Sequence, residues 1–464
     1  MPRAMPTSRV SSSATPLRGI TIVVVGAGLA GLTAARTLSK RGADVHVVDA
    51  RERVGGRVHT LRDGELGPFH AEAGGELVDE DHAAIRQLAA ELGVPLVRVL
   101  RRGFGLALEV KGRVQIAPSQ RAIWSELRRL LTPALQAFDA ARRDWHSAIA
   151  SELASRSVTE LLSMAGAGPH LHDFAVALRG FFAADPAALS SLVLVEELLS
   201  GANPGTAAMY RFADGGSSLA DALVRDADIV LHLRHEVRAI RQANGRVHVG
   251  LVGPDHRRAW LEADYAVVTA PVPIVLGWEL SPPLPADQRR AFTMLSYGPA
   301  TKVLMQFRSR WWRRTGRPNA FGTNLPIGAV WEAAEEQRDA AILTLLAGGT
   351  ASAELQAIAK TEGSAGLVNR LRWLGRTRER EPVAHVTSWD ADRWALGGYA
   401  VFGPQFDPAM RPWLSRSFKH VLFAGEHTSE EWPGYMNGAV ESGLRAAKEL
   451  EGLEMLARLQ ARRA

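Results

Sequence analysis

Hydrophobic residues occur in short runs near both ends of the chain and at helical spacing in between. The β-branched run over residues 20–25 predicts a buried parallel strand. Residues 29–40 predict a helix that ends near Gly42, and residues 45–48 predict a second strand. This first patterned segment is therefore a β-α-β unit, which is typical of an α/β protein with a parallel sheet.

From Asp81 to about Leu199 the spacing of apolar residues favours helices. The pattern predicts helices over 82–92, 119–131, 133–153 and 158–165, separated by proline and glycine. Strand patterns return at 229–233, 237–240, 246–251, 266–269, 342–346 and 419–424, and a long helix follows over 439–459. Residues 301–307 alternate in the manner of a half-buried strand.

The composition is that of a globular protein with two domains. The 464 residues exceed one typical core, and 46% are hydrophobic against 22% charged. No apolar run is long enough to cross a bilayer. The first 18 residues are rich in Ser, Pro and Arg and lack the apolar stretch of a secretory signal. We therefore expect a disordered tail on a cytoplasmic protein that binds no membrane.

Two features of the composition exclude whole classes of chemistry. The chain has no cysteine, which excludes disulfides, zinc–thiolate sites and a cofactor attached through cysteine. The net charge is +6, but no nucleic-acid-binding motif accompanies it. We interpret the excess as solvated surface arginines and expect no nucleic-acid partner. HExxH and GxSxG motifs are absent, and we expect no metal site.

Residues 26–31, GAGLAG, form a G-x-G-x-x-G motif between the first strand and the first helix. Gly26 allows a tight turn, Gly28 allows a pyrophosphate to approach the backbone, and Gly31 allows the helix to pack on the strand. The helix N-terminus offers free N–H groups to phosphates. Asp49 ends the second strand, where a carboxylate can accept hydrogen bonds from ribose hydroxyls. This context predicts a dinucleotide site.

Further glycine pairs and charges occur at both ends of the chain. RVGGR at 53–57 places Arg53 and Arg57 beside two glycines, where the arginines could clamp a diphosphate. EAGG at 72–75 offers main chain on which a flat ring could lie. FAGEHT at 423–428 places Glu426 just beyond the last predicted strand, and Gly434 and Gly438 lead into the final helix.

Together, GAGLAGL, RVGGR, AGGELVD, FAGEHTS and PGYMNGAVESG resemble the motifs of the flavin-dependent amine oxidase family, in the family's order. That family includes monoamine and polyamine oxidases, flavin-type histone demethylases and L-amino-acid oxidases. The resemblance implies an α/β fold with a discontinuous Rossmann-type FAD-binding domain and a mixed α+β substrate-binding domain. We expect the first at residues 19–80, 206–285 and 390–464, and the second at 81–205 and 286–389.

The resemblance also implies which residues contact FAD, which would be held without a covalent bond. By motif match, Asp49 would hold the adenosine ribose, Arg57 the pyrophosphate and Glu426 the ribityl chain. Val237 would contact the adenine through its backbone. Alternatively, Val237 has no ligand role, because valine is common in strands. The residues expected at the cofactor are Gly26, Gly28, Leu29, Ala30, Gly31, Asp49, Ala50, Arg51, Gly56, Arg57, Gly74, Gly75, Glu76, Val237, Gly425, Glu426, Met436 and Ala439.

Lys302 interrupts a run of apolar residues, and two interpretations of it are open. In the family, a lysine in the matching segment reaches the reactive nitrogen of the flavin through a water. Alternatively, Lys302 lies on an edge strand and points to solvent. The resemblance favours the catalytic interpretation.

Aromatic residues are expected beside the flavin. Tyr435 matches one wall of the family's aromatic cage, which guides a neutral amine to the ring. The second wall falls on Tyr399 or on Ala400, and Ala400 would leave the cage open to a bulkier substrate. Trp389 would lie against the flavin with Trp394 supporting it, although a core position also suits a tryptophan.

The resemblance implies an oxidase that takes a hydride from an amine C–H and returns the electrons to oxygen as hydrogen peroxide. One alternative is an L-amino-acid oxidase, in which Arg102 or Arg179 would fold over the site and bind the carboxylate. The others are a desaturase or dehydrogenase acting on a natural product and a flavin-binding scaffold. His427 is expected to be structural, and a homodimer is expected because it is the commonest assembly.

Overall fold

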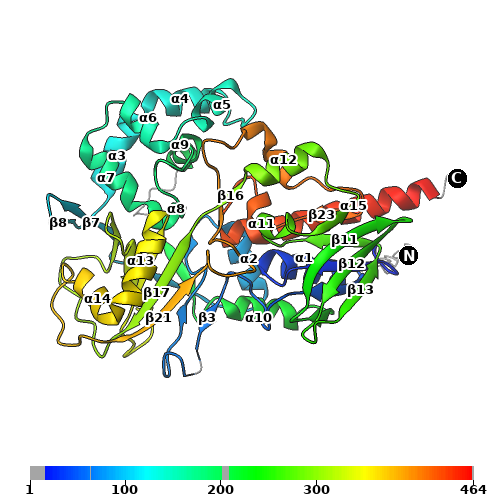
Figure 1. Cartoon of the computed structure of the whole chain (residues 1–464), viewed down its shortest axis with the longest axis horizontal. Helices are drawn as coiled ribbons and strands as arrows, with labels where there is room; N and C mark the ends of the chain where they lie inside the picture. The colour runs from blue at the N-terminus through cyan, green and yellow to red at the C-terminus, as the bar shows by residue number, and fades with distance from the viewer. Residues whose placement is uncertain (1–15, 63, 201–207, 462–464) are drawn as a thin grey trace, which may run out of the picture.

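A five-stranded parallel sheet forms the centre of the part nearest the chain termini (Figure 1). The structure, a computed structural model, describes residues 16–62, 64–200 and 208–461. The strand order is β10-β2-β1-β14-β23, with β1 at Thr21–Val25, β2 at Asp44–Val48, β10 at Val230–His232, β14 at Tyr265–Val268 and β23 at Val421–Phe423. The sheet therefore joins strands from both ends of the sequence.

Helices α1 (Leu29–Lys40) and α15 (Met436–Ala461) lie side by side against this sheet, and α10 (Ser217–Arg225) packs on α1. A Cβ atom at Gly443 of α15 would lie only 2.4 Å from the Ala30 carbonyl oxygen of α1. Glycine is required there because the two helices touch through their backbones. This contact places the N-terminus of the final helix beside the glycine turn that precedes α1.

Two smaller sheets flank the parallel sheet. One has the order β13-β12-β11-β15, with β11 at Glu236–Ala243, β12 at Arg246–Val252, β13 at Arg258–Ala263 and β15 at Glu279–Ser281. The other has the order β5-β9-β6, with β5 at Val78–Asp79, β6 at Leu96–Val99 and β9 at Met209–Phe212. The second sheet crosses the expected domain boundaries near residues 81 and 206.

A seven-stranded mixed sheet dominates the other part of the molecule (Figure 1). Its order is β21-β17-β20-β19-β18-β7-β8, with β7 at Phe104–Val110, β8 at Arg113–Ala117, β17 at Ala300–Gln306, β18 at Ala320–Thr323, β19 at Ala329–Glu332, β20 at Ile342–Gly348 and β21 at Val383–Ser388. Helix α13 (Thr350–Thr361) covers β17, β20 and β21, and α14 (Gly363–Arg370) packs on α13.

Most of the remaining helices form a layer above this sheet in Figure 1. They are α3 (Arg121–Leu130), α4 (Thr132–Ala140), α5 (Ala148–Ala154), α6 (Val158–Met164), α7 (Pro169–Ala177), α8 (Arg179–Phe182) and α9 (Ser191–Leu199). The other elements are α2 (Ala83–Glu91), α11 (Val272–Val275), α12 (Ala286–Met294), β3 (Thr60–Leu61), β4 (Ala71–Glu72), β16 (Ser296–Tyr297), β22 (Ala400–Val401) and the 3-10 turns Pro408–Leu414 and Glu426–Thr428.

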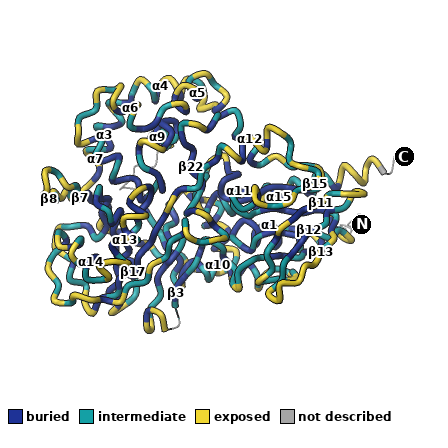
Figure 2. Tube along the Cα trace, in the orientation of Figure 1, coloured by how far each residue is buried: buried dark blue, intermediate teal, exposed yellow. Residues whose placement is uncertain are grey.

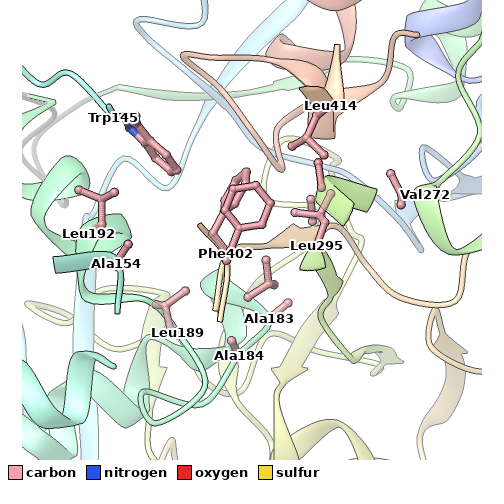
Figure 3. Close-up of a cluster of buried hydrophobic side chains, with 14 of the residues drawn as sticks. Trp145, Ala154, Ala183, Ala184, Leu189, Leu192, Val272, Leu295, Phe402 and Leu414 are labelled. Carbon is pink, nitrogen blue, oxygen red and sulfur yellow. The ribbon is translucent and has the colours of Figure 1, made fainter. Parts of the chain in front are cut away.

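Burial is continuous between the two parts (Figure 2). One hydrophobic cluster runs from Val25 of β1 and Phe423 of β23 to Phe174 of α7. Figure 3 shows its middle, where Phe402 lies between Trp145 on the helical side and Leu295 on the other. The two parts therefore share a core, and the relative position of their facing surfaces is fixed by packing. Among the described residues, no helix is both long and apolar enough to span a membrane.

The α/β fold class is confirmed, and most predicted elements are present. The predicted strand 20–25 corresponds to β1, the helix 29–40 is α1, and the final helix is α15, which begins three residues earlier than predicted. The division into two domains at the expected boundaries stays a prediction. The predicted tail lies mostly outside the described residues, but its last part differs, since Leu17 is fully buried against the parallel-sheet core.

Two predictions for the middle region were wrong. The region 81–199 is not helical throughout, because β6, β7 and β8 occupy much of residues 96–117. The single helix predicted over 133–153 is two helices, α4 and α5. The chain breaks between them at Arg142 and Arg143, both of which have a positive φ that a helix does not accommodate.

Candidate functional site

A cavity of about 1140 Å³ lies where the parallel sheet meets the seven-stranded sheet. This volume slightly exceeds the roughly 1,000 Å³ upper range of ordinary small-molecule pockets, so it can hold a dinucleotide together with a substrate. Every residue expected at the cofactor lines it except Gly31, and all four expected catalytic residues line it, namely Lys302, Trp389, Tyr399 and Tyr435. The structure thus brings together residues from positions 25 to 439.

Two glycines of the glycine turn have different roles: Gly31 is required for packing, whereas Gly28 is available to a ligand. A Cβ atom at Gly31 would lie 1.9 Å from the Gly26 carbonyl oxygen, so Gly31 allows α1 to approach β1. At Gly28, in contrast, a Cβ atom would meet no atom of the surrounding chain nearer than the Gly55 carbonyl oxygen at 4.0 Å, and Gly28 lines the cavity. A backbone open in this way, at the start of a helix, fits the pyrophosphate of FAD.

Asp49 lies at the end of β2 and lines the cavity. Its two carboxylate oxygens accept hydrogen bonds from the backbone N–H groups of Ala27 and Arg51, each at 2.8 Å. Burial raises the pKa of this carboxyl, and these two hydrogen bonds oppose the rise. Asp49 therefore stabilises the glycine turn directly, and each of its oxygens keeps a lone pair that could accept from a ribose hydroxyl.

The expected arginine clamp needs a correction at Arg53. Its guanidinium donates to the backbone carbonyls of Val54, Gly56 and Val58 and does not line the cavity. Arg53 therefore holds the RVGGR loop in shape, because the carbonyls of a tight loop need donors. Arg51 lines the cavity instead, where it forms a bidentate pair with Asp392 at 2.7 Å.

Arg57 and Glu426 meet in the cavity wall, although they are 369 positions apart in sequence. Arg57 donates to Glu426 at 2.8 Å and to the Gly398 carbonyl at 2.8 Å. The Glu426 carboxylate also accepts from the backbone N–H groups of Ala400 and Gly434. One buried carboxylate thereby connects four segments that surround the expected flavin.

Lys302 is on β17, which is paired with β20 on one side and β21 on the other. The edge-strand interpretation is therefore wrong, and so is the half-buried alternation, since β17 is buried along six of its seven residues. The Lys302 ammonium donates to the Gly74 carbonyl at 3.0 Å and forms an ion pair with Glu76. Its side chain is 3% exposed and lines the cavity.

The two tyrosines lie near each other in the same cavity. The Tyr399 ring lies against Gly434, immediately before Tyr435, and its hydroxyl donates to the Phe181 carbonyl of α8. The Glu197 carboxylate and burial raise the pKa of the Tyr435 hydroxyl well above 10, and Tyr399 adds to the rise. Ala400 contributes its backbone N–H to Glu426, and both Tyr399 and Ala400 line the cavity, so the second wall of the cage stays a prediction.

Two tryptophans flank Arg51 in the wall. The Trp389 indole N–H donates to the Ala73 carbonyl at 3.1 Å, next to the Gly74–Gly75 pair. The Arg51 guanidinium lies 5.9 Å from the Trp389 ring centre and 5.4 Å from that of Trp394. Both tryptophans line the cavity, so each ring packs against the protein and could also contact a ligand.

His427 is buried beside the cavity wall and accepts or donates one hydrogen bond with the Tyr297 hydroxyl at 3.1 Å. Burial lowers the pKa of its imidazole to about 4. A neutral ring at pH 7 with a protein partner favours the expected structural role.

Carboxylates gather in the cavity lining near Tyr435. Asp79, Asp81, Glu196 and Glu197 all line it. Burial and the neighbouring acids raise the pKa of Glu197 to about 7 and that of Asp79 to about 6. Sequence patterns did not single out this group, because acids in helices and turns are ordinarily solvated.

His82 completes a group with Asp79 and Asp81 that has the side chains of a cation site. Its Nδ1 accepts the backbone N–H of Asp79 at 3.0 Å. In the neutral ring the proton is then on Nε2, and burial lowers the pKa to about 4, so neutral is the state at pH 7. A metal ion would need that Nε2 lone pair, and this geometry does not offer it.

Sequence reasoning also missed Arg211 of β9 and Trp331 of β19. Trp331 lines the cavity, whereas Arg211 is buried outside the lining. Both donate to Glu76, Trp331 at 2.8 Å. Neither residue belongs to a glycine or charge motif, and only their pairing with Glu76 in space reveals them. The two arginines considered for a substrate carboxylate lie elsewhere: Arg102 is exposed, and Arg179 pairs with Asp185 outside the cavity lining.

Known proteins share both the sequence pattern and the fold. The profile of the family described as flavin containing amine oxidoreductase matches residues 29–450. An L-amino-acid oxidase of Siganus canaliculatus is 27% identical, over 94% of this chain and 86% of its own. A putative flavin-containing monoamine oxidase of Mycobacterium tuberculosis is 25% identical, over 94% and 97%.

Among solved structures, the cyclohexylamine oxidase from Brevibacterium oxydans IH-35A superposes with a TM-score of 0.81. It is 23% identical, and the match covers 93% of this chain and 99% of that one. The fold and the order of the motifs thus agree along nearly the whole length. The chain belongs to the flavin-containing amine oxidoreductase family and is an oxidoreductase that uses FAD.

Proposed function

We propose that the protein oxidises a primary or secondary amine, with molecular oxygen as the electron acceptor and hydrogen peroxide as a product. Bound FAD would supply the hydride acceptor. Lys302, Trp389, Tyr399 and Tyr435 would form the wall on the substrate side, since all four line the same cavity as the dinucleotide motif. The two tyrosines would orient the amine nitrogen, because a fixed approach lowers the barrier to transfer.

The observation that carries this proposal is the negative charge of the side chains that line the cavity near Tyr435. Glu197 and Asp79 line the cavity near Tyr435, and above their raised pKa values of about 7 and about 6 these acids are anions that attract an ammonium group and repel a carboxylate. The one arginine in this region with a buried side chain, Arg411, is already occupied. It packs 3.7 Å from the Trp145 ring centre, donates to the Glu430 carbonyl and pairs with Glu196.

A screen of matched pairs would test the proposal. Each pair consists of an amine and the amino acid that differs from it only by the carboxylate: cadaverine and lysine, phenethylamine and phenylalanine, tyramine and tyrosine. We expect peroxide release with at least one amine and a kcat/KM at least tenfold lower for its amino acid. Peroxide release from the amino acids alone would contradict the proposal.

An L-amino-acid oxidase is the second candidate, because relatives of that name match most of the chain. It requires a cation placed for a substrate carboxylate, and the described cavity offers Arg143 in addition to Arg411. Arg143 is half exposed and pairs with Asp139. The matched pairs distinguish the two candidates directly, since they differ only in the group that this cation would bind.

The remaining expectations about state and location belong to the same proposal. FAD would be bound without a covalent link, and the protein would act in the cytoplasm as a homodimer. Oxygen would accept the electrons directly. Anaerobic mixing with an amine should bleach the flavin absorbance, and admission of air should restore it with release of one peroxide per flavin.

A further inference from the structure

Four charged side chains of alternating sign form a buried row that ends at the cavity. The row runs from Glu336 through Arg211 and Glu76 to Lys302. The side chains are 15%, 1%, 3% and 3% exposed, respectively. Their charges sum to zero. Pairing of opposite charges in this way offsets the desolvation free energy of buried ions.

Glu76 is the shared partner within this row. One of its oxygens accepts from Lys302, and the other accepts from both Arg211 and the Trp331 indole N–H. Burial alone would raise the pKa of Glu76, but Lys302 and Arg211 hold it below its usual range. The carboxylate is therefore ionised, and each of its oxygens already accepts a hydrogen bond from a cationic partner.

We propose that Glu76 is a positioning residue that fixes the Lys302 ammonium beside the reacting part of the flavin. This inference rests on the proposed function. Within it, the Lys302 ammonium would assist the reaction of the reduced enzyme with oxygen, because a fixed cation in the cavity stabilises the negative charge that develops on oxygen. Glu76 and the Gly74 carbonyl take two of the three ammonium hydrogens. Both acceptors belong to the glycine-pair segment that lines the cavity, so the third hydrogen has a defined direction.

A single atom replacement at Glu76 would remove this restraint. In Glu76→Gln the amide oxygen would stay with Arg211 and Trp331, since two donors point at that position. The amide NH₂ group would then face the Lys302 ammonium, donor against donor, and push it from its place. In the opposite amide orientation the NH₂ group would face two donors, the Arg211 guanidinium and the Trp331 indole N–H.

The experiment measures oxygen reactivity without using any amine. The FAD-loaded enzyme is reduced with dithionite and mixed with oxygenated buffer in a stopped-flow instrument. We expect Lys302→Met to slow reoxidation by about tenfold or more, since it removes a fixed cation near developing negative charge. Glu76→Gln should slow it to within about threefold of the Lys302→Met value. The double variant should be no slower than Lys302→Met alone, because both changes act through the same ammonium.

Glu336→Gln is the matched control. It makes the same chemical change at the outer end of the row, where the carboxylate contacts Arg211 but neither Lys302 nor the cavity. Its reoxidation rate should stay within about twofold of the parent. Thermal unfolding of all variants provides a readout that is independent of activity, and the losses from Glu76→Gln and Lys302→Met should not add.

Four outcomes separate the possible failures. A parental reoxidation rate in folded Glu76→Gln, with a slow Lys302→Met, would overturn the role of Glu76 alone. Additive effects in the double variant would do the same. If Lys302→Met itself reoxidises normally, the role of Lys302 is wrong and that of Glu76 falls with it. An enzyme that no amine reduces would refute the proposed function, whereas the dithionite experiment would still decide the role of Glu76.

Discussion

Two glutamates four positions apart show how local partners determine the state of a buried acid. Glu76 has two cationic partners, and its pKa is lowered despite burial. Glu72 accepts hydrogen bonds from the Thr60 hydroxyl and the Gly216 N–H but forms no ion pair with any residue that the structure describes, and burial raises its pKa to about 7. The sequence EAGGE contains both residues, so the difference comes from the strands that surround them and could not be predicted from the motif.

Glu72 therefore predicts a pH dependence of stability. The unfolded chain loses this proton near pH 4.5, whereas the folded protein keeps it to about pH 7. Unfolding releases a proton between these values, so the free energy of unfolding falls as the pH rises through this window, by on the order of 3 kcal/mol. In Glu72→Gln that part of the decline should vanish. Chemical denaturation at pH 5 and pH 8 would measure it, and an identical decline in both proteins would rule out the assignment.

Tyr435 provides a test of the proposed cage. The ring contacts His82 and Trp432 at centre distances of 5.2 and 5.8 Å, yet 39% of the residue stays exposed, which leaves a face for the substrate. Tyr435→Ala should slow anaerobic flavin reduction by about tenfold or more, since misplaced reactants lose rate steeply. Tyr435→Phe keeps the ring and should retain most of the rate. FAD content should be unchanged in both, and equal rates in all three proteins would make Tyr435 a packing residue.

At the scale of elements, local pattern predicted the parts that are built from consecutive residues. The β-α-β unit was predicted because a strand, a glycine turn and a helix follow one another within 28 residues, from 21 to 48. The hairpin of β7 and β8 is local, and the prediction of helices across 81–199 overlooked it. The pairing of β7 with β18 could not be predicted, because the two strands are more than 200 positions apart and share no local signal. Lys302 was placed on an edge strand in one interpretation for the same reason: the neighbours of β17 are distant in sequence.

The glycine turn allows a matched pair of substitutions within one element. Gly31→Ala would drive its methyl group into the Gly26 carbonyl, so we expect destabilisation of about 1–3 kcal/mol or more and poor folding. Gly28→Ala has no such neighbour and should fold, but its methyl group would occupy the space expected for the pyrophosphate. FAD affinity in this variant should fall at least tenfold. Thermal unfolding and FAD fluorescence quenching would measure the two effects, and a stable Gly31→Ala protein would contradict the packing argument.

At the scale of the whole molecule, the cofactor site exists only when both ends of the chain are in place. Arg57, from the first 60 residues, contacts Glu426, from the last 40, and Glu426 in turn accepts the Gly434 N–H just before α15. The motifs identified these residues, but the direct contact between Arg57 and Glu426 followed from the fold. A ligand that spans this junction is expected to couple the two ends.

The last prediction follows from this coupling and from the absence of cysteine. FAD bound to the folded protein alone should stabilise it by about 2.7 kcal/mol at a free concentration one hundred times its Kd. The thermal midpoint should therefore rise with added FAD. Glu426→Ala removes the acceptor of Arg57, Ala400 and Gly434, so its midpoint should be lower and should respond less to FAD. Acid precipitation should leave all flavin in the supernatant, since the chain has no thiol to hold it. Flavin retained in the pellet, or a midpoint insensitive to FAD, would mean that the cofactor is attached or that the junction is not its site.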